Sequence, residues 1–119
     1  MLNLDTHILL HAVTGSLRAS ERKLLVSRRW SISAIVLWEL AKLAQLGRIE
    51  IDLDSAEVTR LLSGIRVWPL DLEVCRKLRG LDFRGDPADE IIAATSLVHD
   101  LPLVTRDRVI RKSRLLQFA

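Results

Sequence analysis

Short apolar runs that favour β-strands alternate with longer helical stretches along the chain, and this alternation limits the possible folds more than any other feature. The strand-like runs span Leu2–Leu4, Trp30–Ser33, Ile65–Leu70, Leu101–Thr105 and, more weakly, Leu115–Phe118. The helical stretches cover residues 6–14, 19–27, 34–46, 54–63, 71–80 and 86–99. This order predicts an α/β fold in which a central parallel sheet of four to five short strands is flanked by helices.

Residues that favour helix ends mark several of these boundaries. Small polar or acidic residues that suit the N-cap position precede four of the helices, and these are Ser33, Asp54, Asp71 and Asp86. Gly47 follows the third helix, where a glycine readily ends a helix in the left-handed conformation. The helix boundaries are therefore expected close to these residues.

The length and composition of the chain predict one domain, residues 1–119. With 119 residues and 49% hydrophobic residues, the chain can bury one core, built mainly from aliphatic side chains because aromatics are only 4%. Cys75 is the sole cysteine and is expected to be a small buried residue. The N-terminus does not resemble a signal peptide and no apolar run approaches the ~20 residues of a membrane span, so we expect a cytoplasmic protein with no membrane partner.

Positive charge is modest overall but concentrated in two places. The formal net charge is +3 and the isoelectric point about 9.6, a weak indication of an anionic partner such as nucleic acid. One basic cluster lies at residues 18–29 and the other follows the fourth predicted strand. The second cluster supplies the candidate RNA-binding residues Arg106, Arg108, Arg111 and Lys112. A solvated surface with no ligand remains the alternative for both clusters.

Two acids stand just past the ends of predicted strands. In parallel sheets, binding sites form beyond the carboxyl ends of the strands. Asp5 follows the first strand and Asp107 follows the fourth. If these two strands are neighbours, their carboxylates converge.

Two further acids lie on predicted helices. Asp89 is in the first turn of helix 86–99, and Glu39 is embedded in the otherwise apolar stretch 35–41, where a charge is costly unless it is paired or ligated. Carboxylates that gather in one place repel each other and need a cation. Ligation by oxygen alone favours Mg²⁺ or Mn²⁺ over Zn²⁺, and such ions assist the hydrolysis of phosphate esters.

Each of the four acids also has an ordinary structural interpretation, and spacing alone does not choose between the two. Helix capping or a favourable place at a helix N-terminus would account for Asp5, Asp89 and Asp107. Glu39 would then pair with Lys42, and Asp107 has a second alternative in pairing with an adjacent arginine. Asp86 is most simply an N-cap, with a supporting role at the site as its alternative.

The sequence around each acid resembles a motif of the PIN-domain family. The four segments are residues 4–7, 31–41, 86–95 and 101–107, and each contains one of the four acids. They occur in the family's order and span almost the whole chain. The resemblance is closest to VapC-type toxins of bacterial and archaeal toxin–antitoxin pairs.

This resemblance implies a PIN-like domain that is a ribonuclease dependent on Mg²⁺ or Mn²⁺ and hydrolyses RNA phosphodiester bonds. The catalytic and metal-binding acids would be Asp5, Glu39, Asp89 and Asp107, the last directly or through water. Thr6 and Thr105 would orient carboxylates or water. Asp100 stands where the family often has glycine, but aspartate tolerates the left-handed conformation, so we expect little effect.

The partners that the resemblance implies are an RNA substrate and a cognate antitoxin protein. Helix 34–46 has more apolar residues than one buried stripe can hold, which predicts an exposed groove or a self-association surface. We therefore expect a homodimer and an antitoxin that binds near Trp38. An ordinary, closely packed core is the alternative.

Two other functions remain as alternatives. A catalytically inactive PIN-like module would only bind a partner or RNA, although the presence of all four acids argues against it. A receiver-like signalling domain would need paired acids after the first strand and a lysine after a late one, whereas only Asp5 follows the first strand. His7 and His11 are spaced as zinc ligands on a helix but have no evident third ligand, so we interpret them as helix-face or substrate-proximal residues.

Overall fold

Four parallel strands form the central sheet of the computed structural model, which describes residues 1–119. The strands are β1 (Leu2–Leu4), β2 (Trp30–Ser33), β3 (Arg66–Trp68) and β4 (Leu103–Val104). Their order in the sheet is β3-β2-β1-β4, and every neighbouring pair is parallel. The predicted α/β fold with a parallel sheet is confirmed.

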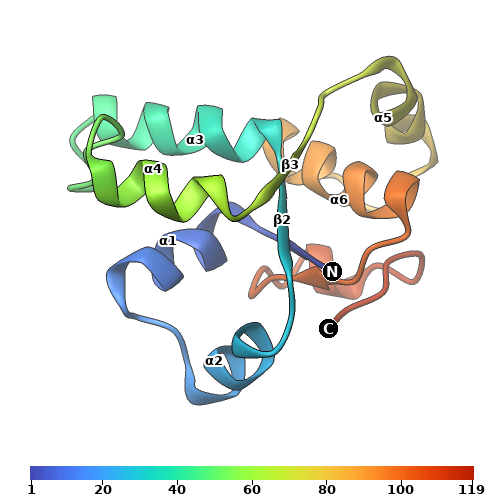
Figure 1. Cartoon of the computed structure of the whole chain (residues 1–119). Helices are drawn as coiled ribbons and strands as arrows, with labels where there is room; N and C mark the ends of the chain where they lie inside the picture. The colour runs from blue at the N-terminus through green and yellow to red at the C-terminus, as the bar shows by residue number, and fades with distance from the viewer.

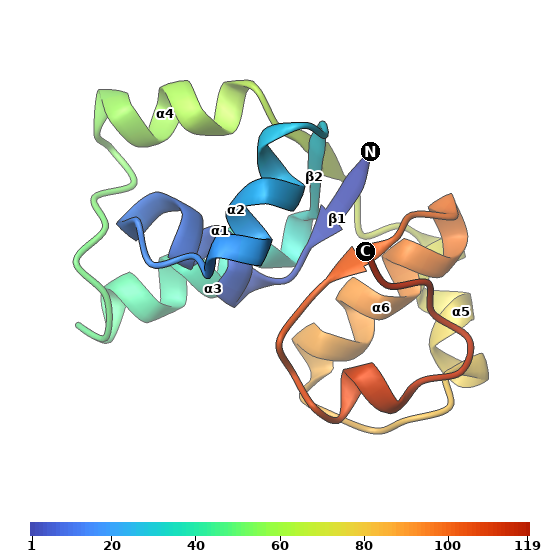
Figure 2. The ribbon, with the colours of Figure 1, turned by 90° about the horizontal axis from the view of Figure 1, so that it is seen from below.

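Six helices surround the sheet. They are α1 (Thr6–Thr14), α2 (Ala19–Val26), α3 (Ala34–Gln45), α4 (Ala56–Ser63), α5 (Leu72–Lys77) and α6 (Pro87–His99). Figures 1 and 2 show α1, α2 and α4 on one side of the sheet and α5 and α6 on the other, while α3 continues from the end of β2. Two 3₁₀ turns, Leu78–Gly80 and Ile110–Lys112, complete the regular structure. No helix is long and apolar enough to cross a membrane.

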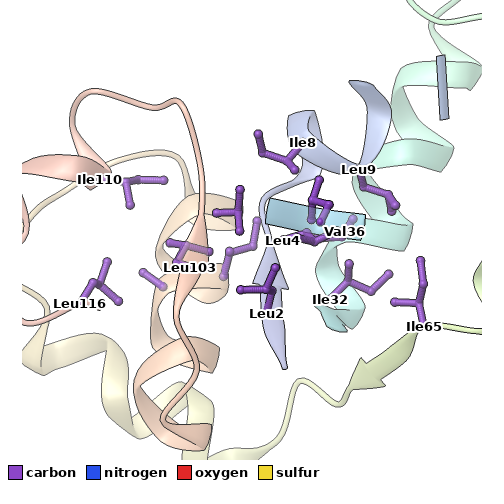
Figure 3. Close-up of a cluster of buried hydrophobic side chains, with 14 of the residues drawn as sticks. Leu2, Leu4, Ile8, Leu9, Ile32, Val36, Ile65, Leu103, Ile110 and Leu116 are labelled. Atoms are coloured by element: carbon purple, nitrogen blue, oxygen red, sulfur yellow. The ribbon is translucent and has the colours of Figure 1, made fainter. Parts of the chain in front are cut away.

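The central strand β1 is buried on both faces, as expected of a strand covered by helices on each side. Leu2 and Leu4 are fully buried in the middle of the core, with side chains of β4 and the C-terminal segment on one side and those of β2 and α3 on the other (Figure 3). Between them Asn3 donates hydrogen bonds to the Ser96 hydroxyl at 2.8 Å and the Ile92 carbonyl at 3.3 Å. This buried amide ties β1 to α6.

Three of the predicted strands are shorter than expected, and proline explains much of the difference. Pro69 ends β3, and Pro102 stands before β4; neither has an N–H to donate to a neighbouring strand. The predicted strand at 115–118 is reduced to a single bridge between Leu103 and Phe118. The sheet therefore has four strands.

Two predictions about single residues were wrong. Ser55, not Asp54, caps α4, because its hydroxyl accepts a hydrogen bond from the Val58 N–H at 3.2 Å. Cys75 is exposed, not buried. It lies on a helix of six residues that buries only Val74, and the next position faces away from the core.

Two other predictions are confirmed. Asp100 ends α6 in the left-handed conformation, with φ of 54°, so aspartate fills the position that glycine often takes. The helix α3 leaves apolar surface exposed, since Trp38 is 56% exposed and Leu46, at its end, 60%.

Candidate active site

The carboxyl ends of β1 and β4 lie side by side, and this pairing brings the first acid into place. Leu4 pairs with Val104, so the next residues, Asp5 and Thr105, come level at the same edge of the sheet. The Thr105 hydroxyl donates a hydrogen bond of 2.6 Å to Asp5 Oδ2, and Asp5 is only 4% exposed. The condition on which the convergence of Asp5 and Asp107 depended, that the first and fourth strands are neighbours, is met.

Asp5 occupies the N-cap position of α1, yet its carboxylate forms no capping hydrogen bond. Its bond from Thr105 crosses between two strands instead. The simple capping interpretation of Asp5 therefore does not describe this side chain.

Glu39 reaches the same region from α3. The hydroxyl of Thr6, at the start of α1, donates a hydrogen bond to Glu39 Oε1. Lys42 instead binds the side chain of Gln45, with Nζ 3.0 Å from Oε1, so the alternative pairing of Glu39 with Lys42 is not present. The two threonines that sequence analysis named as supporting residues thus each hold one of the acids.

Asp89, in the first turn of α6, has the most perturbed carboxylate of the site. Burial, and after it the negative charges of Asp5, Asp107, Asp86 and Glu39 in that order, together raise its pKa from 3.8 to about 7. A helix N-terminus would by itself favour the charged form. The raised pKa therefore shows that repulsion and desolvation outweigh the helix dipole here.

Asp107 has two roles in the structure. Its Oδ1 atom accepts hydrogen bonds from the N–H groups of Val109 at 2.8 Å and Ile110 at 3.0 Å, so it caps the following turn, as the structural alternative proposed. Its own N–H donates to the Thr105 hydroxyl at 3.0 Å. The same residue also lines the acidic cleft described next.

All five acids considered from the sequence line one cleft of about 340 Å³ with no apolar side chain in its wall. We call it the acidic cleft, and its lining residues are Asp5, His7, His11, Glu39, Asp86, Asp89, Arg106 and Asp107. Asp86 sits at the N-cap of α6, as predicted, but makes no capping hydrogen bond. A cleft of this size holds about ten water molecules or a hydrated ion with a phosphate group.

Arg106 stands at the rim of the acidic cleft with its charge already paired. Its Nε and Nη2 atoms bind the two carboxylate oxygens of Glu21 at 2.7 and 2.6 Å, and its Nη1 atom lies 3.1 Å from His11 Nε2. The bond from Arg106 is the main cause that lowers the pKa of Glu21 to about 2. Burial, followed by the Arg106 charge, lowers the pKa of His11.

Sequence reasoning did not identify Glu21 as part of this arrangement. Glu21 lies 85 positions from Arg106 along the chain and belongs to no motif around an acid. Of the other candidate RNA-binding residues, Arg111 donates to the Thr105 carbonyl at 3.1 Å, while Arg108 and Lys112 are exposed and do not line the acidic cleft.

The donor set of the acidic cleft suits a hard divalent cation. Its five carboxylates supply oxygen ligands and no thiolate is near, which favours Mg²⁺ or Mn²⁺. No three acidic, histidine or cysteine side chains stand close enough together to hold one ion as they are now placed. Ligation would therefore require the carboxylates to move toward each other, which their mutual repulsion opposes until a cation is present.

Fold and site together define an α/β domain with a cluster of acids at the carboxyl edge of its parallel sheet. Residues 3–114 match the family model of the PIN domain, and the chain belongs to the PIN-domain family. The protein named Ribonuclease VapC22 of Mycobacterium tuberculosis is 34% identical over 87 residues, which cover 71% of this chain and 67% of that protein. The resemblance drawn from the four motifs is confirmed, and the receiver-like alternative is wrong.

Solved structures share the fold at lower sequence identity. A chain in the crystal structure of VapBC2 from Rickettsia felis bound to a DNA fragment from their promoter has a TM-score of 0.75 and 18% identity; the match covers 100% of this chain and 98% of that chain. A chain in FitAcB from Neisseria gonorrhoeae has a TM-score of 0.72 and 23% identity, with coverage of 100% and 97%. At these identities the likeness concerns the fold.

Proposed function

We propose that this chain is an endoribonuclease that depends on Mg²⁺ or Mn²⁺ and acts as the toxin of a toxin–antitoxin pair. The observation that carries the proposal is the convergence of four separate PIN motifs on one acidic cleft. The identity of 34% to a protein named a ribonuclease supports RNA as the substrate. Water attack on an RNA phosphodiester is the reaction that such a group of acids serves.

In this proposal Asp5, Glu39 and Asp89 hold the cation and Asp107 completes the site directly or through water. A divalent ion bound there supplies Lewis acidity, which lowers the pKa of water and stabilises negative charge on phosphate. The chain's own contribution is to fix the ligands. Thr105 and Thr6 donate to Asp5 and Glu39, which orients one oxygen of each carboxylate.

A metal titration tests the proposal. The purified chain should cleave RNA with Mg²⁺ or Mn²⁺ and lose that activity in excess chelator, with activity returning when the ion is added back. Calorimetry should detect Mn²⁺ binding that disappears in Asp89→Asn. Cleavage that continues undiminished in chelator would contradict the mechanism, and a chain that binds RNA and Mn²⁺ without cutting would support the inactive module instead.

The protein partners are proposed from exposed apolar surface. Trp38 and Leu46 are more than half exposed at α3, which suits a homodimer contact or the apolar segment of an antitoxin. Structures of toxin–antitoxin complexes with the same fold support an antitoxin as partner.

A substitution on α3 tests this surface. Trp38→Glu should weaken the complex with the product of the adjacent gene, measured by pull-down, and shift the sedimentation of the chain alone. Lys42→Glu places the same acid on the same exposed helix without removing apolar area and is the control. A monomeric chain that binds no adjacent gene product would remove the toxin–antitoxin proposal and leave the nuclease proposal intact.

A further inference from the structure

A second, larger cleft adjoins the acidic cleft and has the opposite charge. We call it the basic cleft; its volume is about 540 Å³, and its wall includes Arg18, Ser20, Arg106 and Arg111 over the apolar side chains of Leu24 and Val104. Arg106 lines both clefts, and Thr105, which lines the basic cleft, donates to Asp5 in the acidic one. The two clefts are therefore separated by the width of one side chain.

The charges of the basic cleft are unequally satisfied. Glu21 is the acidic side chain in its wall, and both of its carboxylate oxygens are bound by Arg106. Arg18 and Arg111 are exposed and have no acidic partner within ion-pair distance. The cleft thus presents two guanidinium groups that form no ion pair, beside a cleft that holds five carboxylates.

The surrounding structure restricts the Arg111 guanidinium and the backbone of Arg18 before any ligand arrives. Arg111 donates to the Thr105 carbonyl at 3.1 Å and lies over the Phe118 ring, 5.1 Å from its centre. The Arg18 backbone N–H donates to Glu21 Oε1 at 2.7 Å, so the carboxylate that fixes Arg106 also fixes the backbone of Arg18. A guanidinium has five N–H donors, so Arg111 keeps donors free for a ligand. Preorganised donors lose less entropy on binding.

We propose that the basic cleft binds an RNA phosphate next to the one that is cleaved, through Arg18 and Arg111, so that the RNA backbone crosses Arg106 between the two clefts. This inference rests on the proposed RNA cleavage. A strand whose scissile phosphate lies among carboxylates is repelled along its flanking phosphates, and the basic cleft offsets that repulsion. Guanidinium groups suit this role because they bind phosphate oxygens in pairs.

Salt-dependent binding tests the proposal without requiring cleavage. The probe is a fluorescein-labelled RNA hexamer of mixed sequence, bound to the chain in EDTA and followed by anisotropy over a range of KCl concentrations. The double variant Arg18→Gln/Arg111→Gln should bind about tenfold more weakly. Its salt slope should fall by about 0.7 for each phosphate contact that is lost. Mn²⁺ binding measured by calorimetry should be unchanged.

A matched variant separates a local site from a general loss of charge. Arg28→Gln/Arg60→Gln removes the same charge from a different cleft, which also contains Trp30 and Gly64 and shares no residue with the acidic cleft. This control should retain nearly the whole salt slope. Arg18→Lys/Arg111→Lys keeps the charge without the paired donors and should recover the salt slope while affinity recovers only in part.

The outcomes are distinct. Equal losses in the two glutamine double variants, or an unchanged salt slope in Arg18→Gln/Arg111→Gln, would overturn the phosphate site.

Poly-glutamate that displaces RNA from the wild-type chain, but not from Arg18→Gln/Arg111→Gln, would assign the basic cleft to an acidic protein segment and also overturn it. If Arg111→Gln lowers the thermal midpoint because its hydrogen bond to the Thr105 carbonyl is lost, the affinity and salt slope of the single variant Arg18→Gln decide the test. Wild-type chain that binds the hexamer as described but never cuts RNA would refute the proposed function alone.

Discussion

At the five helices whose N-cap side chain can accept a hydrogen bond, the N-termini fall into two groups, and the difference follows the position of the acidic cleft; α2, with Arg18 at its N-cap, belongs to neither. At α3, α4 and α5 the N-cap side chain accepts a backbone hydrogen bond, and those residues are Ser33, Ser55 and Asp71. At α1 and α6 the N-cap residues Asp5 and Asp86 form no such bond. Both of these uncapped aspartates line the acidic cleft.

The comparison teaches that the same residue type serves two purposes, which the surroundings select. A capping side chain typically stabilises a helix by about 1 kcal/mol. At the acidic cleft Asp5 and Asp86 forgo this stabilisation and stay available to a ligand, whereas Asp107 both lines the cleft and caps the turn that follows it. Departures from good local structure of this kind are expected at functional sites.

Asp5→Asn should cause the largest effect, a loss of RNA cleavage of at least about a hundredfold, because one charged ligand of the proposed cation is gone. The thermal midpoint without metal should stay level or rise, since one source of carboxylate repulsion has been removed. The matched change at a capping position, Asp71→Asn, should leave cleavage unchanged, because asparagine caps as well as aspartate. Initial rates and melting curves check this, and equal activity in the two variants would erase the distinction.

Thr105→Val should reduce cleavage by about ten- to a hundredfold, the usual cost of losing a residue that orients a metal ligand. The variant loses the hydroxyl that donates to Asp5 and accepts from the Asp107 N–H. Thr59→Val, which removes a hydroxyl bonded to the Ser55 carbonyl on α4, is the control. Calorimetry should show weaker Mn²⁺ binding in Thr105→Val, and full activity there would mean that Asp5 needs no orienting donor.

The pKa of Asp89 predicts how pH acts on the metal and on stability. The pKa of Asp89 rises from 3.8 to about 7 on folding. At pH values between these two, Asp89 is therefore protonated in the folded state and ionised in the unfolded state. This group's contribution to the free energy of unfolding is therefore fully present below pH 4 and is lost as pH rises to about 7. Mn²⁺ affinity should fall by about tenfold for each pH unit below 7, because the ion must displace that proton.

The variant Asp89→Asn provides the control for these pH effects. Without metal, its melting temperature should change less between pH 4 and pH 7 than that of the wild-type chain. A wild-type profile of Mn²⁺ affinity that stays flat from pH 6 to pH 8 would show that Asp89 is ionised throughout and that the other acids do not crowd it.

Asp71→Ala should produce the smallest effect, a loss of about 1 kcal/mol in the free energy of unfolding with cleavage unchanged. The Val74 N–H, which donates a hydrogen bond to Asp71 Oδ1 at 3.0 Å, would lose its acceptor. Asp86→Ala, at an N-cap position that makes no such bond, should cost less stability. Chemical denaturation measures both, and a larger loss in Asp86→Ala would reverse the grouping of the helix N-termini.

The four acids could be found from the sequence because each lies in a local pattern that the fold leaves unchanged. Asp5 and Asp107 follow strands, and a parallel sheet places such residues at one edge. The position of Glu39 within an apolar stretch already suggested a special environment. Element order and spacing left an ordinary structural role open for each acid, and the resemblance of the four surrounding segments to PIN-domain motifs is what grouped them into one site.

Contacts between distant segments could not be predicted in this way. Nothing near Arg106 indicates that Glu21 neutralises it, and nothing in the two basic clusters shows that Arg18 and Arg111 face one cleft. The exposure of Cys75 follows from which face of α5 packs on the core, since this helix buries Val74 and turns the next position outward. Tertiary packing decides such features, and a local pattern does not contain it.

The pairing of β1 with β4 has a consequence for how the protein is made. β1 lies in the middle of the sheet and is synthesised before the other three strands, and its neighbour β4 is the last of the four strands to leave the ribosome. The Thr105–Asp5 hydrogen bond spans 100 positions, and contacts of such separation form late in folding. A nascent chain that stops before β4 therefore lacks both Thr105 and Asp107. Ribosomes translating this message thus carry an incomplete acid cluster until β4 and the residues that directly follow it have been made.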